Sequence, residues 1–292
     1  MRIGIVSPVV TRLPGVAGDW EASAGIGELA RVAQAADRLG FDHVTCSEHV
    51  GVPVDVAEQR GGTYWDPLAT LGHLSALTSR IRLATQVLVL GYHHPLEIVK
   101  RYGTLDEVSG GRVVLGLGVG SLEEEFALLE VPFAGRGERA DDALAALRAA
   151  WGRRVPSYAG SHHAFDGFVV EPHGVRTDVP LWIGGRTRRS LRRAVELGTG
   201  WVPFGLPLDD LAAMLDGSDL PADFEVVLSP GRPLDPLADA DRTRARLERT
   251  IAAGATLLSV TVRADSVDHY EDQLAALAEL VDLEPPATGG AA

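Results

Sequence analysis

The sequence predicts a (β/α)₈ barrel, and two observations carry that prediction. Short apolar segments with strand composition alternate with amphipathic helical segments along the chain, which is typical of a parallel sheet. Eight such strand–helix units fit into the 292 residues, the number that closes a barrel. An open, doubly wound sheet is the alternative arrangement of the same units. We therefore expect one domain over residues 1–283, with its ligand site at the carboxyl ends of the strands.

The first four units precede residue 152. Strands are expected where apolar and β-branched residues run together, and helices where apolar residues recur every three or four positions. Asp66-Pro67 marks one helix start, because the carboxylate caps the helix and proline suits its first turn. Gly110-Gly111 marks a helix end, since a left-handed cap penalises a Cβ. The expected strands are 3–7, 42–47, 81–90 and 112–117, and the expected helices are 25–39, 67–77, 95–109 and 137–151.

The last four units begin near residue 181. Before them, residues 152–180 form an insertion in which Asp166-Gly167, flanked by apolar and aromatic residues, predicts a small hairpin. Residues 284–292 are rich in Pro, Gly and Ala, so this tail is predicted to be disordered. The remaining expected strands are 181–183, 200–204, 224–229 and 256–263, and the remaining helices are 187–197, 208–215, 239–253 and 266–282.

Composition excludes several classes of partner. The net charge of −13 argues against nucleic acid and against an anionic membrane surface, since both require a basic surface. The single cysteine, Cys46, excludes an internal disulfide and is typical of a reducing compartment. Neither a cationic leader nor an apolar run of membrane-spanning length is present in the sequence. We expect a cytoplasmic protein that acts on a small molecule.

Two glycine-rich segments mark candidate ligand contacts at strand ends. Gly116, Gly118 and Gly120 follow each other at period two, and a strand lacks side chains in this way where something flat or bulky lies against its backbone. Gly184-Gly185 lead into a helix that starts near residue 187, whose exposed N–H groups would attract an anion. Arg186 adds a positive charge there. Glycine-rich loops over 10–24 and 50–64 are expected at the same end.

These segments resemble the bacterial luciferase-like flavin oxidoreductases, and within them the branch that uses the deazaflavin coenzyme F420. The resemblance spans nearly the whole chain, and it depends on the order and spacing of short motifs, none of which is specific alone. They are Ser47-Glu48-His49, Ala84 to Leu90 followed by His94-Pro95, Thr104-Leu105-Asp106, Ser109 to Arg112, Gly116 to Gly120, Glu123 to Phe126, Pro180 to Gly185 and Gly198 to Trp201.

The resemblance implies an oxidoreductase that moves hydride between coenzyme F420 and a small organic substrate. It places His49 beside the reactive edge of the ring, where an imidazole can donate a hydrogen bond or move a proton. Glu48 can hold the tautomer of His49 or act as a hydrogen-bond partner of a loop, and the Gln86-Val87 peptide is expected to be cis behind the ring. The expected cofactor contacts are Glu48, Gln86, Val87, Gly118, Val119, Gly120, Gly184, Gly185 and Arg186. Aromatic residues near strand ends, Trp65, Tyr92 and Trp201, are expected to wall the substrate pocket.

Two other functions remain open. The same fold serves FMN-dependent monooxygenases that use reduced flavin and dioxygen, and a flavin-binding protein without catalysis is the alternative from another class. The relative that oxidises a sugar phosphate has a glutamate directly after the glycine exit, where this chain has Ser121, which argues against that substrate. His93-His94 and His162-His163 lack the spacing of a metal motif, so no metal is expected. We also expect a homodimer or a higher homo-oligomer.

Overall fold

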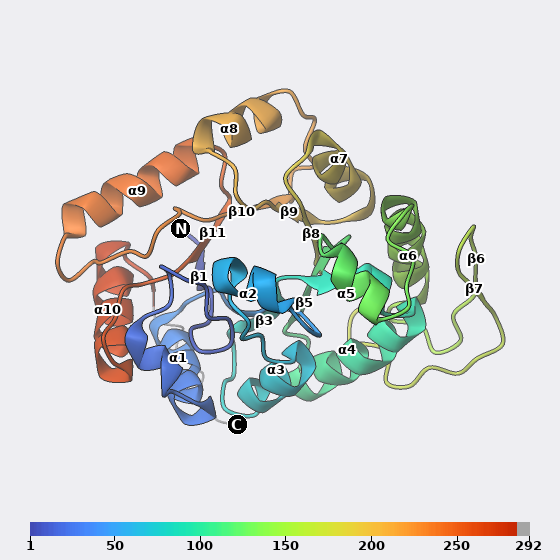
Figure 1. Ribbon diagram of the computed structural model, residues 1–292, viewed down its shortest axis with the longest axis horizontal. Coiled ribbons are helices and arrows are strands. Elements are labelled where there is room, and N and C mark those ends of the chain that lie inside the picture. Colours follow the sequence, from blue (N-terminus) through green and yellow to red (C-terminus); the bar gives the residue numbers. More distant parts are fainter. Residues whose placement is uncertain (285–292) are drawn as a thin grey trace.

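Eight parallel strands close into a barrel in this computed structural model, which describes residues 1–284 (Figure 1). The last strand of the ring pairs with the first, and all eight pairings are parallel. The predicted fold class is therefore confirmed. In ring order the strands are β1 (Ile3–Ile5), β2 (His43–Cys46), β3 (Arg82–Thr85), β5 (Val113–Gly118), β8 (Leu181–Gly184), β9 (Gly200–Val202), β10 (Glu225–Leu228) and β11 (Leu257–Val260).

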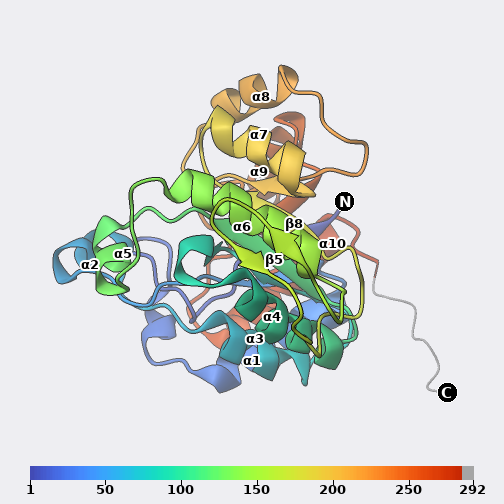
Figure 2. The same cartoon turned by 90° about the vertical axis from the view of Figure 1, so that its right-hand side faces the viewer.

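Helices form the outer layer of the barrel (Figures 1 and 2). The side chain of Asp66 accepts a hydrogen bond from the Ala69 amide at 2.8 Å, and Gly110 ends its helix at φ 70°, as the sequence predicted. The helices between strands are α1 (Ile26–Leu39), α3 (Pro67–Ser75), α4 (Pro95–Ser109), α6 (Arg136–Ala150), α7 (Arg188–Leu197), α8 (Leu208–Asp216), α9 (Ala240–Ala252) and α10 (Val267–Leu280).

Short helices lie in the loops at the carboxyl ends of the strands. Helix α2 (Val54–Arg60) occupies a segment that the sequence predicted to be a glycine-rich loop, and α5 (Glu123–Leu128) follows β5. Figure 2 shows α2 and α5 projecting together from one end of the barrel. Two 3₁₀ turns, η1 (Asp19–Ala22) and η2 (Leu90–Tyr92), lie in neighbouring loops. These segments cover the end where the site was expected.

Two predicted elements differ from the structure. The expected strand 81–90 is interrupted: β3 ends at Thr85, and β4 (Leu88–Val89) follows the Gln86-Val87 peptide, which is cis as expected. The insertion contains the predicted hairpin, formed by β6 (Tyr158–Ala159) and β7 (Ala164–Phe165). Its turn is at 160–163 and not at Asp166-Gly167, because the Asp142 carboxylate on α6 accepts hydrogen bonds from three consecutive backbone amides there, those of residues 161–163. Apart from Glu284, the predicted disordered tail lies outside the described residues.

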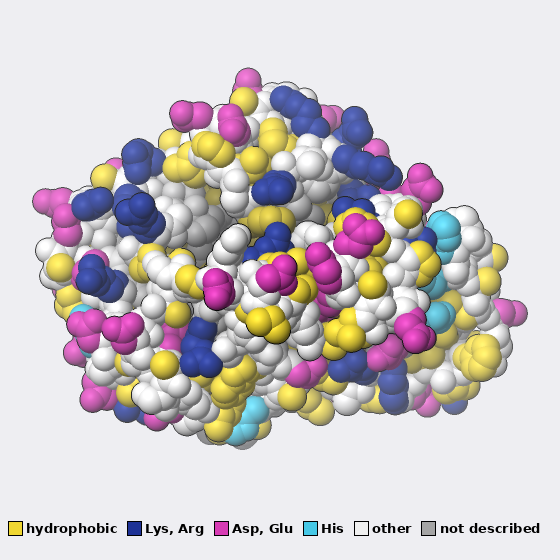
Figure 3. All heavy atoms as spheres, in the orientation of Figure 1, with side chains coloured by type: hydrophobic (Ala, Val, Ile, Leu, Met, Phe, Trp, Pro, Cys, Tyr) yellow, Lys and Arg dark blue, Asp and Glu magenta, His cyan; other side chains and the backbone are white. Residues whose placement is uncertain are grey.

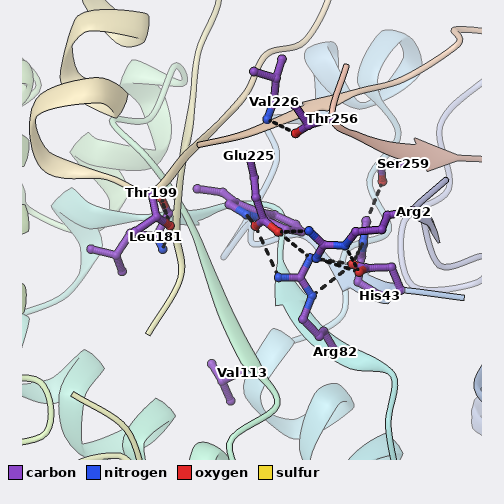
Figure 4. Close-up of polar contacts among 12 residues, drawn as sticks. Arg2, His43, Arg82, Val113, Leu181, Thr199, Glu225, Val226, Thr256 and Ser259 are labelled. Atoms are coloured by element: carbon purple, nitrogen blue, oxygen red, sulfur yellow. Dashed lines mark hydrogen bonds and ion pairs between the residues drawn. The ribbon is translucent and has the colours of Figure 1, made fainter. Parts of the chain in front are cut away.

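Apolar and polar layers fill the inside of the barrel. An apolar layer consists of Ala84, Val114, Trp182, Val202, Val227 and Leu257. Below it, Arg82 donates hydrogen bonds to Asp42 at 2.6 Å and to Glu225 at 3.2 Å, and the indole N–H of Trp182 donates to Glu225 at 2.5 Å (Figure 4). Burial opposes the ionisation of Asp42, but the His43 hydrogen bond and the charge of Arg82 hold its pKa well below the usual range. This network fills the amino-terminal end of the barrel and leaves the opposite end for a ligand.

Candidate active site

A cavity of about 440 Å³ opens at the carboxyl ends of the strands. Its polar groups include uncharged side chains at the ends of the first three strands and the carboxylate of Glu21, and its apolar walls come mainly from the loops after β1, β9, β10 and β11. Figure 3 views this face of the molecule, which is hollowed near its centre. The volume lies within the range of small-molecule sites, which are mostly apolar with a few placed polar groups. The polar lining includes Ser7, Thr45, Ser47 and Gln86, and the apolar walls include Phe204 and Val262.

Gln86 is the predicted cofactor contact that lines this cavity. Its backbone carbonyl accepts a hydrogen bond from the Ser47 hydroxyl at 2.7 Å, and its side-chain Oε1 lies 3.4 Å from the hydroxyl of Ser259. Ser259 in turn lies 3.2 Å from Nε2 of His43, whose Nδ1 lies 3.0 Å from Asp42. Burial lowers the pKa of His43, which favours the neutral imidazole. A continuous chain of polar groups thus connects the filled end of the barrel to the cavity wall.

The glycines at the end of β5 accommodate protein atoms, and this corrects the expectation that their missing side chains leave room for a ligand. A Cβ on Gly118 would lie 2.7 Å from Cγ2 of Val87, and one on Gly184 would lie 3.1 Å from its Cγ1. A Cβ on Gly116 would overlap the carbonyl oxygen of Thr85. The glycines therefore allow Val87 to pack inside the upper barrel. The turn at Gln86-Val87 occupies the space that the missing glycine side chains leave. The expected uninterrupted strand over 81–90 does not include this turn.

His49 is held by Glu125, and the prediction that Glu48 can hold its tautomer is wrong. The imidazole Nδ1 lies 2.8 Å from Oε2 of Glu125, and that oxygen also accepts a hydrogen bond from the Tyr92 hydroxyl at 2.6 Å. The other oxygen accepts from the amides of Val50 at 2.5 Å and Gly51 at 3.2 Å. Glu125 is fully buried, so these four donors replace water around its charge.

The electrostatics of this cluster determine the tautomer of His49. Burial alone would raise the pKa of Glu125, but the hydrogen bonds from His49 and Tyr92 outweigh it and lower the pKa below its ordinary value. An ionised carboxylate only accepts hydrogen bonds, so Nδ1 of His49 carries the proton. Nε2 is then the nitrogen that can exchange a proton with another molecule. The ring of Tyr64 packs edge-on against the imidazole, with centroids 4.4 Å apart.

Sequence reasoning missed the role of Glu125. It lies at the end of an acidic run, Glu123 to Glu125, that resembles an ordinary solvated first turn of a helix. Only Glu125 faces inward, next to buried Phe126. The available signal was its position just beyond the glycine exit, but the partners that bury it lie more than 30 residues away in the chain.

Glu48 has partners of its own. Its carboxylate accepts hydrogen bonds from the Val89 amide and from Nε2 of His93, each at 2.7 Å. Burial disfavours the charged imidazole of His93, but the Glu48 hydrogen bond outweighs it and raises the pKa. Glu48 is itself buried, so the pair fastens β4 to the end of β2. In this position Glu48 orients the Gln86-Val87 turn rather than facing the cavity.

The three aromatic residues expected to wall the pocket lie outside the lining of the cavity. Trp201 is fully buried, and its indole N–H donates to the Ser190 hydroxyl of α7 at 3.3 Å. Its neighbour Val202 faces the barrel interior, and strand residues alternate between faces, so Trp201 points to the helix layer and its predicted role is wrong. Trp65 and Tyr92 are half-buried on the His49 side of the mouth, where the Tyr92 hydroxyl is bound to Glu125.

Arg186 lies at the rim of the cavity. It is exposed, and its guanidinium lies 5.9 Å from the ring centroid of Phe204, which lines the cavity. Thr187 caps the following helix, since its hydroxyl accepts from the Ser190 amide at 3.1 Å. Gly185, with φ 138°, adopts a conformation that a side chain would strain. Cationic Arg186 and this glycine turn are therefore adjacent to the cavity mouth, whereas Val119 and Gly120 are half-buried beyond β5.

Within residues 1–284, no group of three or more His, Cys, Asp or Glu side chains is arranged to hold a metal ion. In the same residues no helix is long and apolar enough to span a bilayer.

The fold and the site together define a (β/α)₈ barrel enzyme with its cavity at the carboxyl ends of the strands. A sequence model of the luciferase-like monooxygenase family matches residues 1–279, so the chain belongs to that family. It is an oxidoreductase of the luciferase-like type, as its sequence motifs implied.

Several known proteins are similar to this chain. An uncharacterised protein of Mycobacterium tuberculosis is 30% identical over 201 residues, which cover 64% of this chain and 71% of that protein. A putative coenzyme F420-dependent oxidoreductase of the same species is 30% identical over 186 residues, covering 60% of this chain and 50% of that protein. The F420-dependent glucose-6-phosphate dehydrogenase of Microbacterium testaceum is 30% identical over 181 residues, covering 61% of this chain and 52% of that protein.

Solved structures share the fold at lower identity. The monooxygenase RslO1 from Streptomyces bottropensis superposes with a TM-score of 0.74 at 21% identity, covering 96% of this chain and 98% of that one. An F420-dependent secondary alcohol dehydrogenase, solved with an F420-acetone adduct, superposes with a TM-score of 0.74 at 15% identity, covering 97% and 98%. These likenesses extend over nearly the whole barrel.

Proposed function

We propose that the protein is a coenzyme F420-dependent oxidoreductase that transfers hydride to or from a small, uncharged organic substrate. The observation that carries this proposal is the cavity at the carboxyl end, whose described lining offers hydroxyls, one carboxamide and the Glu21 carboxylate but no cationic side chain. The 30% identity to two proteins named as F420-dependent supports the choice of cofactor. The absence of a cation in the lining, together with Ser121 after the glycine exit, disfavours a phosphorylated substrate.

The residues around the cavity fit a flavin-like ring. Such a ring is apolar on its faces and polar along its edges, and the cavity pairs apolar walls with a polar floor. Gln86 would meet a polar edge of the ring, Phe204 would cover part of a face, and Arg186 at the rim would face a phosphate group. When bound, the deazaflavin would supply the hydride chemistry, while the protein binds, orients and excludes water.

His49 would handle a proton in this reaction. Glu125 holds Nδ1 protonated, so the lone pair of Nε2 is the group that accepts a proton from a substrate hydroxyl, or returns it in the reverse direction. His49 is not among the residues that line the cavity, but it lies two residues beyond Ser47, which does, and one fifth of its side chain is exposed. Replacing His49 with Ala should lower turnover by roughly 10²–10⁴-fold and leave cofactor affinity within about tenfold.

The FMN-dependent monooxygenase is the second candidate, because the family that matches the chain is described as luciferase-like monooxygenases. Fluorescence titration of the purified protein with coenzyme F420 and with FMN separates the two. We expect tighter binding of F420, and we expect Gln86→Leu to weaken it by about tenfold, the value of one hydrogen bond. Gln34→Leu on α1, remote from the cavity, is the matched control. A preference for FMN would favour the monooxygenase, and binding of neither cofactor would refute both candidates.

A further inference from the structure

Four arginines line a second hollow, of about 530 Å³, at the same end of the barrel. Arg232 belongs to the loop after β10, and Arg242, Arg246 and Arg249 belong to α9. Positions four and three residues apart lie on one face of a helix, so the three α9 side chains point the same way. Figure 3 shows basic side chains gathered over α9, beside the central hollow of this face.

These arginines lack acidic partners. Among residues 1–284, no carboxylate lies within 4.0 Å of any of the four guanidinium groups, whereas ion pairs are formed by arginines elsewhere, such as Arg31, Arg82 and Arg193. The chain carries 40 acidic and 27 basic residues, and four of the basic residues share this one hollow. Burial, and then the charges of the three other arginines, lower the pKa of Arg246. The cluster repels itself unless an anion joins it.

Arg246 holds the hollow in shape. Its guanidinium donates to the carbonyl oxygens of Pro233 and Pro230, each at 3.0 Å, and to that of Arg232. These bonds fasten the loop after β10 to α9 and keep Arg232 on the hollow. Arg246 thereby uses several of its donors within the protein, so Arg232, Arg242 and Arg249 are the residues that can offer theirs to a ligand.

The loop also connects the hollow to the cavity. Ser229 and Gly231 line the cavity, while Pro230 and Arg232 line the arginine hollow. The strand before this loop, β10, is the seventh in the barrel, and loops after the seventh and eighth strands of such barrels frequently bind phosphate. The two spaces therefore share one wall, at a position suited to an oxyanion.

We propose that Arg232, Arg242 and Arg249 form a binding site for a polyvalent oxyanion of the phosphate type. Guanidinium groups match the geometry of phosphate oxygens with paired N–H donors, and several of them together favour a multiply charged anion over chloride. Two sources supply this chemistry: free phosphate, or a phosphate group on the molecule that occupies the adjoining cavity. The proposed anion site is the same for both sources, and the proposal holds whether the cavity binds coenzyme F420 or FMN.

Thermal unfolding at low ionic strength tests the site with pyrophosphate as the probe. Pyrophosphate should raise the Tm of the unaltered protein, and Arg242→Gln combined with Arg249→Gln should weaken its apparent affinity by at least about tenfold, since each charged hydrogen bond is worth roughly that factor. Arg244→Gln is the matched control, because Arg244 lies on the same helix outside the hollow. A single Arg249→Gln, compared with Arg244→Gln, keeps the net charge equal between variant and control.

The outcomes are decisive. No stabilisation of the unaltered protein by millimolar pyrophosphate, an unchanged affinity in the double variant, or an equal loss in Arg244→Gln would each overturn the proposal. A second arm identifies the source: Arg249→Gln should weaken binding of FMN but not of riboflavin if the site takes the phosphate of the cavity's ligand. If Arg249→Gln leaves the binding of both flavins unchanged while it weakens the binding of pyrophosphate, the site is assigned to free phosphate.

Discussion

Replacing Glu125 with Gln should destabilise the protein and reverse the tautomer of His49. The carboxylate accepts four hydrogen bonds, at 2.5 Å, 2.6 Å, 2.8 Å and 3.2 Å, and its side chain is fully buried. A glutamine of the same shape keeps one acceptor oxygen, which the Val50 amide would use. Its NH₂ group then faces His49, and donor faces donor unless the imidazole moves its proton from Nδ1 to Nε2.

The size of the loss follows from these contacts. Hydrogen bonds to a charged group contribute about 1.5–3 kcal/mol each, and neutral bonds about 0.5–1.5 kcal/mol. Four bonds that each lose roughly 1 kcal/mol, partly offset by the lower cost of burying an uncharged amide, give a destabilisation of about 3 kcal/mol. The carboxylate is shielded from solvent, so water and salt do not screen these interactions.

The effect should depend on pH. Hydrogen bonding in the folded protein lowers the pKa of Glu125, so its contribution to stability is fully present above the ordinary carboxyl pKa and is lost as the pH falls through the lower, folded value. The difference in unfolding free energy between the unaltered protein and Glu125→Gln should therefore be largest near neutral pH and shrink below about pH 4.

Urea unfolding from pH 3 to 7 measures this difference, and the ¹⁵N shifts of the His49 ring report its tautomer. Glu124→Gln is the matched control, since it removes the same charge from an exposed position on the same helix. A loss below about 1 kcal/mol at neutral pH, or a loss equal to that of the control, would show that the buried carboxylate does not stabilise this end of the barrel. An unchanged His49 tautomer would refute the proton assignment.

Three further predictions concern packing, reactivity and the rim of the cavity. Gly118→Ala should cost about 1–3 kcal/mol, because its Cβ would lie 2.7 Å from Val87, whereas Gly27→Ala, with nothing within 4 Å, should be neutral or stabilising in the same unfolding assay. Burial raises the pKa of the Cys46 thiol to about 12, so iodoacetamide at pH 8 should modify it in the unfolded chain and not in the native one. Arg186→Ala should weaken binding of FMN more than of riboflavin in fluorescence titrations, and equal losses would place the phosphate elsewhere.

The barrel itself was predictable from local patterns. Strand and helix periodicities depend on residues a few positions apart, so the eight units and their order could be read from the chain alone. Caps are equally local: Asp66 bonds an amide three residues on, and Gly110 adopts the left-handed conformation that its position requires. The predicted cis peptide at Gln86-Val87 came from the family resemblance, and the structure contains it.

Pairings between distant residues were decided only by the tertiary structure. His49 binds Glu125 and not its neighbour Glu48, because α5, in the loop after β5, lies against the residues that follow β2. The missing side chain of Gly118 makes room for Val87, which lies in the turn between β3 and β4. Which face of a strand a side chain occupies depends on register, a tertiary property that turned Trp201 toward α7.

Contacts between distant residues also decide where the hairpin turns and how the arginine hollow is formed. Asp166-Gly167 is a suitable local turn, yet three backbone hydrogen bonds to Asp142 on α6 place the turn at 160–163 instead. The arginines of α9 are spaced along one helix face, but only the folded loop brings Arg232 beside them. Local sequence determines which elements form, through short-range sterics and hydrogen bonds. Which charged and polar groups meet depends on chain closure over tens of residues, and no local pattern encodes those contacts.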